Sequence, residues 1–381
     1  MKFRTLLIAS AILFSSQNLA IAGENKTSQF VENYSKLVYA NYKDAYIDAK
    51  EMQKKILDLL DNPNEANLKK AKFAWLIARD SYGQTEIFRF QDGPIDFVDN
   101  KRGLEGPEGR LNSWPLDEAY IDYVVGNKKA GIINNPAQEI TKANLIAKNQ
   151  EENEANVSLG YHAIEFLLWG QDFSLEKAGQ RSFLDFENEK RKKYLKLTTE
   201  ILIEDLEFLL SEWKPSIFRN NHVKSLKKQS EDEVVGNILT SLATLSGFEL
   251  ASERMAVPLD SGDQEDEHSC FSDNTHNDFI YNIKGIENVY LGKYNNIDGI
   301  GIYDILAKKD QELADKITKR ISFIIKLSKD LPTPIDKILA SKKGSDSRVK
   351  MERIVENLQA LSLLFKKAGN KLGVEVSILT E

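Results

Sequence analysis

Apolar residues recur at helical spacing along most of the chain. Between residues 27 and 60 this pattern is carried by Phe30, Tyr34, Leu37, Val38, Ala45, Ile56, Leu59 and Leu60, and Asp61-Asn62-Pro63 ends it. The same periodicity predicts helices over 65–86, 115–126, 137–146, 160–169, 183–213, 234–255, 302–330 and 347–372. No stretch alternates apolar and polar residues convincingly, as a half-buried strand does. The pattern therefore predicts an all-α protein.

Two long irregular segments interrupt the helices, over residues 82–114 and 258–278. Loops of this length are uncommon in compact domains and are usually functional. Lys214-Pro215 and the polar residues 220–232 have the composition of a linker. We therefore expect two helical-bundle domains, 23–214 and 215–381, with the irregular segments near their interface. In each half an apolar helix ends in an acid and a base, Glu86 with Arg89 and Glu253 with Arg254, which suggests an origin by duplication.

The first 22 residues have the features of a signal peptide. Lys2 and Arg4 give a positive start, residues 6–14 are apolar, and Ala20-Ile21-Ala22 is a small-x-small cleavage site. The apolar stretch is shorter than the ~20 residues that span a bilayer. No later segment is apolar for long enough to do so. We expect cleavage after Ala22 and export of a protein without a membrane span.

The net charge and the cysteine content argue against two features, a nucleic-acid partner and an internal disulfide. Cleavage after Ala22 would remove two positive charges and change the formal net charge from −7 to −9. This acidic balance argues against nucleic acid as a partner, because phosphate binding requires clustered Lys and Arg. Cys270 is the single cysteine of the chain, so no internal disulfide is expected in an oxidising compartment.

A histidine and a glutamate stand out in the apolar segment 160–169. His162 and Glu165 are three residues apart and therefore project from one helical face. Such a pair can bind a metal, hydrogen-bond a polar ligand, or satisfy itself as a buried polar pair. Spacing alone favours the last interpretation, because His/Glu pairs at this spacing are common in helices.

A second polar cluster lies in the irregular segment after residue 263. It contains His268, Asp273 and His276, with Asp266 and Glu267 beside them. Two histidines with a carboxylate suit an iron or zinc ion. An acidic surface loop with scattered histidines would have the same composition, and the sequence does not separate the two interpretations.

The other irregular segment offers three further candidates. Glu86 and Arg89 can pair across one helical turn, or Glu86 can supply a carboxylate while Arg89 orients an anionic ligand. Trp114 closes the segment, and an aromatic residue there is more often part of a core than a ligand contact.

Standard catalytic templates are absent from the sequence. No histidine begins His-Glu-x-x-His or the inverted motif, and there is no Gly-x-Ser-x-Gly elbow or phosphate loop. A zinc peptidase needs a metal-bound water and a general base. Glu165 would then have to serve as both ligand and base, or leave one role to another carboxylate such as Glu86.

At these residues the chain resembles the imelysin family, and more closely its iron-regulated protein A branch. The family's Gly-x-His-x-x-Glu signature is complete as Gly160, His162 and Glu165. The similarity extends to residues 82–86, 88–90, 106–109, 112–120 and 266–276, and covers nearly the whole mature chain. It implies two bundle-like domains, a site near their interface, and a link to bacterial iron uptake in the periplasm or on the outer face of the cell. The family is also classed with peptidases.

Three hypotheses follow for the function. The first is an exported protein that binds a metal ion or an iron-bearing small ligand. In it His162 and Glu165 are metal ligands, while Glu86, His268, Asp273 and His276 are candidates to complete the set. Arg89, Trp114, Gly160 and Glu267 would support that site, with a periplasmic or outer-membrane uptake protein as the expected partner. The second hypothesis is a metal-dependent peptidase using the same pair, and the third is a non-catalytic structural or partner-binding module.

Overall fold

The structure is a computed structural model that describes residues 28–99, 103–216 and 218–378. The signal peptide expected over residues 1–22 lies outside the described residues. The fold begins with helix α1 (Gln29–Asp61), capped by the Ser28 side chain, which accepts a hydrogen bond from the Val31 backbone N–H. Helix α2 (Glu65–Gly83) runs back along it and continues into the 3₁₀ turn η1 (Gln84–Phe88).

The segment between η1 and α8 is mostly irregular, with short pieces of regular structure. These are the hairpin β1 (Phe97–Asp99) and β2 (Leu104–Glu105), the turns α3 (Glu108–Leu111), α4 (Glu118–Ile121) and α5 (Gly131–Asn134), and α6 (Lys142–Lys148). Helix α7 (Gly160–Trp169) is buried along its whole length. After η3 (Phe183–Glu187), the long helix α8 (Glu189–Trp213) packs against α1 and α7.

The second half of the chain is built on four long helical segments. The first comprises α10 (Glu231–Thr244), the π-helical segment η4 (Leu245–Ala256) and α11 (Val257–Ser261); the others are α12 (Thr275–Leu291), α14 (Gln311–Lys329) and α16 (Asp346–Leu372). Shorter elements connect them: α9 (His222–Leu226), η5 (Gln264–Asp266), the hairpin β3 (Lys293–Tyr294) and β4 (Ile297–Asp298), α13 (Ile302–Ala307) and α15 (Asp336–Leu339).

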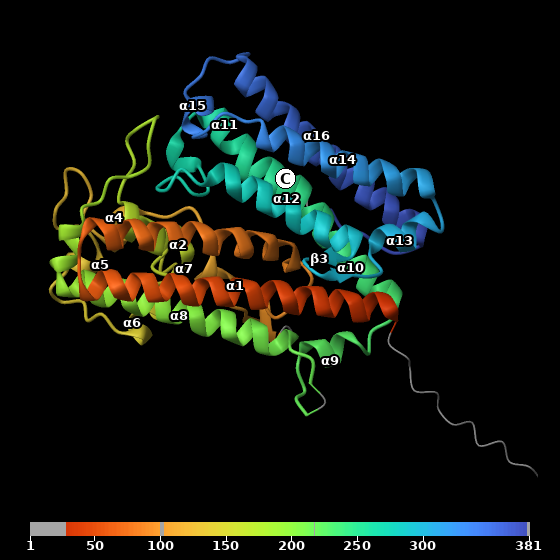
Figure 1. Cartoon of the computed structure of the whole chain (residues 1–381), viewed down its shortest axis with the longest axis horizontal. Helices are drawn as coiled ribbons and strands as arrows, with labels where there is room; N and C mark the ends of the chain where they lie inside the picture. The colour runs from red at the N-terminus through yellow and green to blue at the C-terminus, as the bar shows by residue number, and fades with distance from the viewer. Residues whose placement is uncertain (1–27, 100–102, 217, 379–381) are drawn as a thin grey trace, which may run out of the picture.

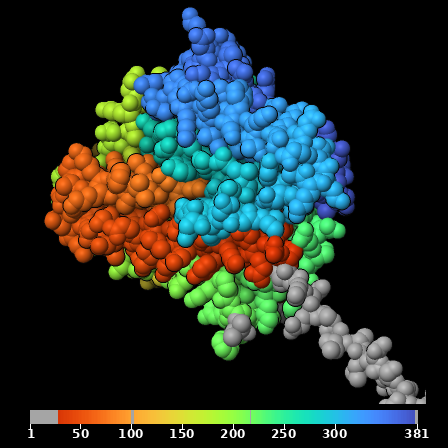
Figure 2. All heavy atoms as spheres, turned by 45° about the vertical axis from the view of Figure 1, so that its right-hand side comes forward, coloured from red at the N-terminus to blue at the C-terminus, as the bar shows by residue number. Residues whose placement is uncertain are grey.

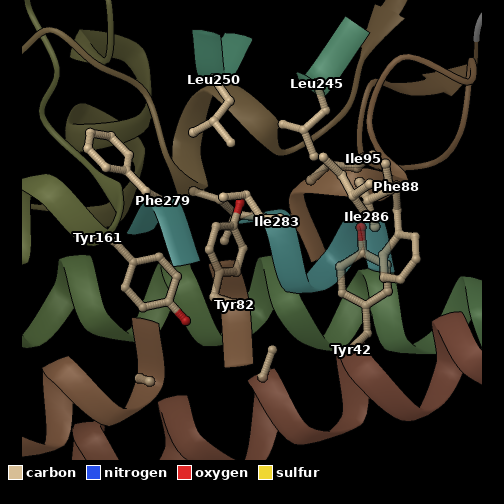
Figure 3. Close-up of a cluster of buried hydrophobic side chains, with 14 of the residues drawn as sticks. Tyr42, Tyr82, Phe88, Ile95, Tyr161, Leu245, Leu250, Phe279, Ile283 and Ile286 are labelled. Atoms are coloured by element: carbon tan, nitrogen blue, oxygen red, sulfur yellow. The ribbon is translucent and has the colours of Figure 1, made fainter. Parts of the chain in front are cut away.

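The two halves lie as adjoining layers of helices (Figure 1). Helices α1, α2, α7 and α8 form one layer, and the helices from α10 to α16 form the other, with α12 packed directly on α2 and η1. In the space-filling view the surfaces of the two halves meet along their length (Figure 2). Figure 3 shows aromatic rings of the first half, such as Tyr82 and Tyr161, packed beneath Leu250, Phe279 and Ile283 of the second. The core is therefore continuous, and the domain boundary at 214/215 stays a prediction.

The all-α class is confirmed, but individual elements differ from the expectation. The helix expected over 115–126 is only the single turn α4, because the chain turns to extended backbone at Asp122. There the Asp122 carboxylate accepts hydrogen bonds from Arg181 Nη1 at 2.8 Å and Arg191 Nε at 2.7 Å. The helix expected over 302–330 is broken into α13 and α14, and Asp310 caps the second of these. Helix α12 was not predicted from the sequence.

One helical stretch, Glu231–Ser261, is long and apolar enough to cross a membrane by length and composition. Such a segment is not expected from the sequence. In the fold, 72% of its most apolar window is buried inside the protein. A buried core helix of this kind does not establish a membrane span.

Candidate functional site

The signature segment begins at a glycine that the packing requires. Gly160 starts α7 at a φ of +88°, a conformation that side chains disfavour. A Cβ atom at this position would lie 2.6 Å from the backbone oxygen of Leu111, far inside contact distance. The glycine therefore allows α7 to start directly against the end of α3, and this contact fixes where the next turn points.

We expect Gly160→Ala to destabilise the protein by roughly 3 kcal/mol or more, because strain and a backbone clash add together. Gly126→Ala is the matched control. Gly126 has a φ of +86°, but nothing lies within 4 Å of its Cβ position. Urea denaturation of both variants measures the difference. Equal losses would show that the contact with α3 is unimportant.

His162 and Glu165 are fully buried and contact each other. Nδ1 of His162 lies 2.9 Å from Oε2 of Glu165. The other oxygen of Glu165 accepts two hydrogen bonds from Ser272, from its backbone N–H at 3.0 Å and its hydroxyl at 2.6 Å. Both carboxylate oxygens are thus in use, whereas Nε2 of His162 is buried without a hydrogen-bond partner among the described residues.

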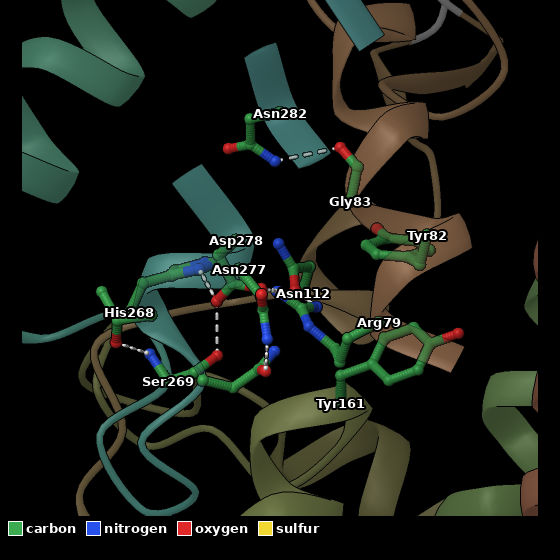
Figure 4. A network of polar contacts seen from close by, with 12 residues as sticks. Arg79, Tyr82, Gly83, Asn112, Tyr161, His268, Ser269, Asn277, Asp278 and Asn282 are labelled. Atoms are coloured by element: carbon green, nitrogen blue, oxygen red, sulfur yellow. Dashed lines mark hydrogen bonds and ion pairs between the residues drawn. The ribbon is translucent and has the colours of Figure 1, made fainter. Parts of the chain in front are cut away.

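His268 is held in the same way by a different carboxylate. Its Nδ1 lies 2.9 Å from Oδ2 of Asp278, which also accepts a hydrogen bond from the Ser269 hydroxyl. The second oxygen of Asp278 accepts a hydrogen bond from Nη2 of Arg79 at 3.0 Å (Figure 4). A carboxylate that accepts the Nδ1 hydrogen leaves the Nε2 lone pair of a neutral histidine free to bind a metal.

The two histidines meet in the interior. Their ring centres are 4.6 Å apart and the ring planes are inclined by 68°. The Trp114 ring packs on the His162 ring at 5.1 Å. The signature helix, the glycine-rich segment and the acidic segment therefore converge, although they lie far apart in the sequence.

A cavity of about 500 Å³ opens beside this pair. Its wall includes Trp114 and His268, together with Arg89, Glu249, Arg254 and Asp266. A cavity of this volume is in the range of small-molecule sites. His162 is absent from the wall and lies behind Trp114 and His268, so a ligand in the cavity would reach His268 first.

Glu86 anchors the other end of the polar network. Its carboxylate accepts hydrogen bonds from Arg254 at 2.7 Å, Arg89 at 3.2 Å and Asn112 at 3.3 Å. Asn112 in turn accepts a hydrogen bond from Arg79, so a buried chain of hydrogen bonds runs from Glu86 to Asp278. Figure 4 shows Asn112, Arg79 and Asp278 of this chain. The carboxylate of Glu86 therefore binds Arg254 and Arg89 and holds these two side chains at the cavity wall.

Burial and nearby charges set the protonation of these groups. Burial lowers the pKa of His162 well below its ordinary value, and burial together with the Arg254 guanidinium lowers the pKa of His268 to about 4. Burial raises the pKa of Glu165 well above its ordinary value, although the hydrogen bonds from Ser272 oppose this shift. For Glu86 burial acts in the same direction, but Arg254 and Arg89 outweigh it and lower the pKa to about 2. Both histidines are therefore neutral at physiological pH.

The low pKa of His268 predicts a pH-dependent stability. Between pH 6.5 and 4 the unfolded chain binds a proton at this histidine while the folded protein does not, so its contribution to stability is lost as the pH falls. By pH 4.5 the loss is on the order of 2–3 kcal/mol. We expect His268→Gln to lose less stability than the wild type between pH 7 and 4.5 in urea denaturation. An identical loss of unfolding free energy in both proteins would contradict the lowered pKa of His268.

The remaining predicted residues lie in the acidic loop or at the start of α12. Asp273 is grouped with Asp172 and Asp336, the set of three carboxylates in the described part of the chain whose ligand atoms lie within 4.8 Å of one another. Glu267 is buried in the same loop, and His276 is half-buried at the start of α12. Of the six predicted metal ligands, His162, Glu165 and His268 lie together, and Glu86 is bound to arginines. Asp273 lies in the acidic loop, and His276 lies in the first turn of α12.

Sequence reasoning missed Arg79, Asn112, Ser272 and Asp278, which connect these groups. Asp278 lies in α12, whose apolar positions Phe279, Ile283 and Ile286 do recur at helical spacing. That periodicity was the signal available for placing Asp278 on a buried helical face. Asn112 and Ser272 lie in the segments 112–120 and 266–276 that carry the family resemblance, but their contacts, like those of Arg79, depend on how distant segments pack.

The fold and this network define an all-helical protein with two carboxylate-backed histidines in its interior. The family model for Imelysin (peptidase M75) matches residues 38–363, and the chain belongs to this family. The resemblance found in the sequence is thus confirmed.

Individual relatives agree with this assignment. Iron-regulated protein A of Synechococcus elongatus is 24% identical over 351 residues, which cover 88% of this chain and 83% of that protein. Among solved structures, an iron-regulated protein A precursor from Parabacteroides distasonis superposes with a TM-score of 0.71 at 17% identity, covering 90% of this chain and 95% of its own. An imelysin-like protein from Psychrobacter arcticum has a TM-score of 0.64 at 15% identity, covering 92% and 98%. The two structures show the shared fold.

Proposed function

We propose that this protein is an exported metal-binding component of bacterial iron uptake, which holds an iron or zinc ion, or an iron-bearing small ligand, beside His162 and His268. The observation that carries the proposal is the pair of histidine rings 4.6 Å apart, each with its Nδ1 against a carboxylate. Metal–nitrogen bonds are about 2.0–2.1 Å long, so one ion binds both rings only when their Nε2 atoms turn toward a shared point, and the proposal requires this arrangement.

Glu165 has a different part in this proposal from the one expected. Both of its oxygens are occupied, one by Ser272 and the other by His162, so it orients the histidine and sets its tautomer. It is not placed as a free general base, which favours binding over peptidase chemistry. A metal on Nε2 of His162 requires the ionised form of Glu165. Because burial raises the pKa of this carboxyl group, binding should release a proton.

The cavity supports a ligand larger than a bare ion. Arg89 and Arg254 present positive charge at its wall, and Glu108, Glu249 and Asp266 present negative charge. Such a wall can accept an iron-bearing ligand with both donors and acceptors. Iron is the favoured metal because the Synechococcus relative is named an iron-regulated protein. Export to the periplasm or outer cell surface rests on the sequence of residues 1–22 and agrees with the word precursor in the name of the Parabacteroides protein.

Metal titration of histidine variants tests this proposal. The chelator-treated mature chain, residues 23–381, is titrated with Fe²⁺ under anaerobic conditions and with Zn²⁺. We expect His162→Gln and His268→Gln each to weaken binding at least about 10-fold, because each removes one nitrogen ligand. His222→Gln is the control, since His222 lies in α9 against Trp213 and has no contact with the pair.

Two outcomes would count against metal binding at this site. Equal affinity in all four proteins would place the metal elsewhere. No binding by the wild type would support the alternative that the polar network only holds the two layers of helices together. Cleavage of a peptide mixture that stops on addition of a chelator would instead favour the peptidase hypothesis.

A further inference from the structure

A second group of acidic side chains includes Asp273, which directly follows Ser272 in the chain. Asp172, Asp273 and Asp336 each place a carboxylate oxygen within 4.8 Å of the other two. They come from three separate parts of the chain. Asp172 follows the end of α7, Asp273 precedes α12 and Asp336 begins α15.

Asp172 and Asp336 are buried and Asp273 is half-buried, and most of their oxygens lack a hydrogen-bond donor among the described residues, although the Ser174 backbone N–H donates to Oδ1 of Asp172. The exposed fraction is 2% for both Asp172 and Asp336. Neither oxygen of Asp336 has a hydrogen-bond partner among the described residues, and the same holds for Oδ2 of Asp172 and Oδ1 of Asp273. Within the described ranges no Lys or Arg forms an ion pair with any of the three.

A fourth carboxylate, that of Glu267, is also buried without a positively charged partner among the described residues. Glu267 is fully buried, and neither of its oxygens has a hydrogen-bond partner in the described parts of the protein. Burial and the charges of Asp336, Asp273 and Asp172 raise its pKa well above the ordinary value. Burial also raises the pKa of Asp336 to about 6 and that of Asp273 to about 8, with neighbouring carboxylates adding to both shifts. Buried like charges of this kind are costly unless a cation or shared protons neutralise them.

We propose that Asp172, Asp273 and Asp336 form a binding site for a hard divalent cation, Ca²⁺ in the first place, separate from the histidine pair. The three ligands are all carboxylates, which suit Ca²⁺ and Mg²⁺ and are poor ligands for soft metals. Ca²⁺ is favoured because it accepts six to eight oxygens in irregular geometry, whereas Mg²⁺ demands a near-ideal octahedron. Glu267 lies outside this group of three ligands and adds only negative charge to its surroundings.

A bound cation would link the three chain segments that contain Asp172, Asp273 and Asp336. Asp273 directly follows Ser272, whose backbone N–H and hydroxyl hold Glu165. A cation bound to Asp273 therefore steadies the loop that supports Glu165, while Asp172 and Asp336 join that loop to both halves of the protein. The inference does not depend on the proposed function, since a structural Ca²⁺ site would remain if the histidines bound no metal.

The test uses the chelator-treated mature chain in calorimetric titration and thermal unfolding with Ca²⁺ up to about 5 mM, a concentration that covers weak extracellular sites. We expect one Ca²⁺ to bind and to raise the Tm by roughly 3–8 °C at saturation. Asp336→Asn and Asp172→Asn should each abolish this rise. Asp330→Asn, at an exposed aspartate, should keep it, and so should His162→Gln.

Shared protons are the competing explanation, and the same experiment separates it. If protons alone neutralise the cluster, the wild type will show no Ca²⁺-dependent change in Tm and no heat of binding. That result would overturn the proposal, and so would a Ca²⁺ response retained in both variants. Because the wild-type measurement needs no substitution, it decides the matter even if a variant fails to fold.

Discussion

Replacing Glu165 with glutamine should reduce the affinity for metal by roughly 10- to 100-fold while leaving the fold intact, as expected for a residue that orients a metal ligand. The amide oxygen of a glutamine can accept the hydrogen bonds that Ser272 donates to Glu165. Its NH₂ group would then face Nδ1 of His162 and donate to it. The ring hydrogen would move to Nε2 and block the lone pair that binds the metal.

This experiment has a control at the cavity wall. Glu108→Gln makes the same substitution at the cavity wall, but Glu108 pairs with Arg89 and does not contact His162. The affinity of both variants is measured by titration with Zn²⁺, and their thermal unfolding is compared with the wild type. If Glu165→Gln binds Zn²⁺ as tightly as Glu108→Gln, then Glu165 does not control metal binding through the tautomer of His162.

The largest effect on stability is expected at Asp278. Asp278→Asn removes the charge that faces Arg79, and the guanidinium of Arg79 is 1% exposed. A buried charge left without its partner costs about 3–5 kcal/mol. Aromatic rings of Trp75, Tyr82 and Tyr161 surround Arg79 and recover only part of this loss.

An exposed aspartate provides the comparison. Asp298 forms an ion pair with Lys293 at 3.1 Å on the surface. Exposed pairs of this kind contribute about 0–1 kcal/mol, so Asp298→Asn should change the free energy of unfolding very little. Urea denaturation at pH 7 measures both variants. A loss at Asp278 no larger than that at Asp298 would show that the buried network does not support the fold.

The long helices were predictable because their own residues carry the signal. Helices α1, α8 and α16 each repeat apolar residues over many turns, and side chains such as Ser28 and Ser345 cap them. Helix α12 was missed because it starts inside a polar segment at Thr275, where the acidic loop hides its first turn. The expected helix over 115–126 failed for a tertiary reason, since two distant arginines bind Asp122 in an extended conformation.

The candidate site was predictable only in part. The spacing of His162 and Glu165 places them on one face of a helix, and the structure gives their contact at 2.9 Å. Neither spacing nor composition shows that Asp278 holds His268, because a turn between them brings the two together. The sequence also does not show that Glu165 orients His162 and is not itself a metal ligand, because this proposed role depends on the hydrogen bond that Ser272 donates to Glu165.

A crystal of the mature protein soaked with iron or zinc, with anomalous scattering recorded at the absorption edge of the metal, tests whether His162 and His268 bind one ion. We expect a peak about 2.0–2.2 Å from Nε2 of His162 and of His268, with Glu165 and Asp278 still bound to the Nδ1 atoms. A peak bonded to Glu165 itself, or a fully loaded crystal with no peak near either histidine, would contradict this expectation.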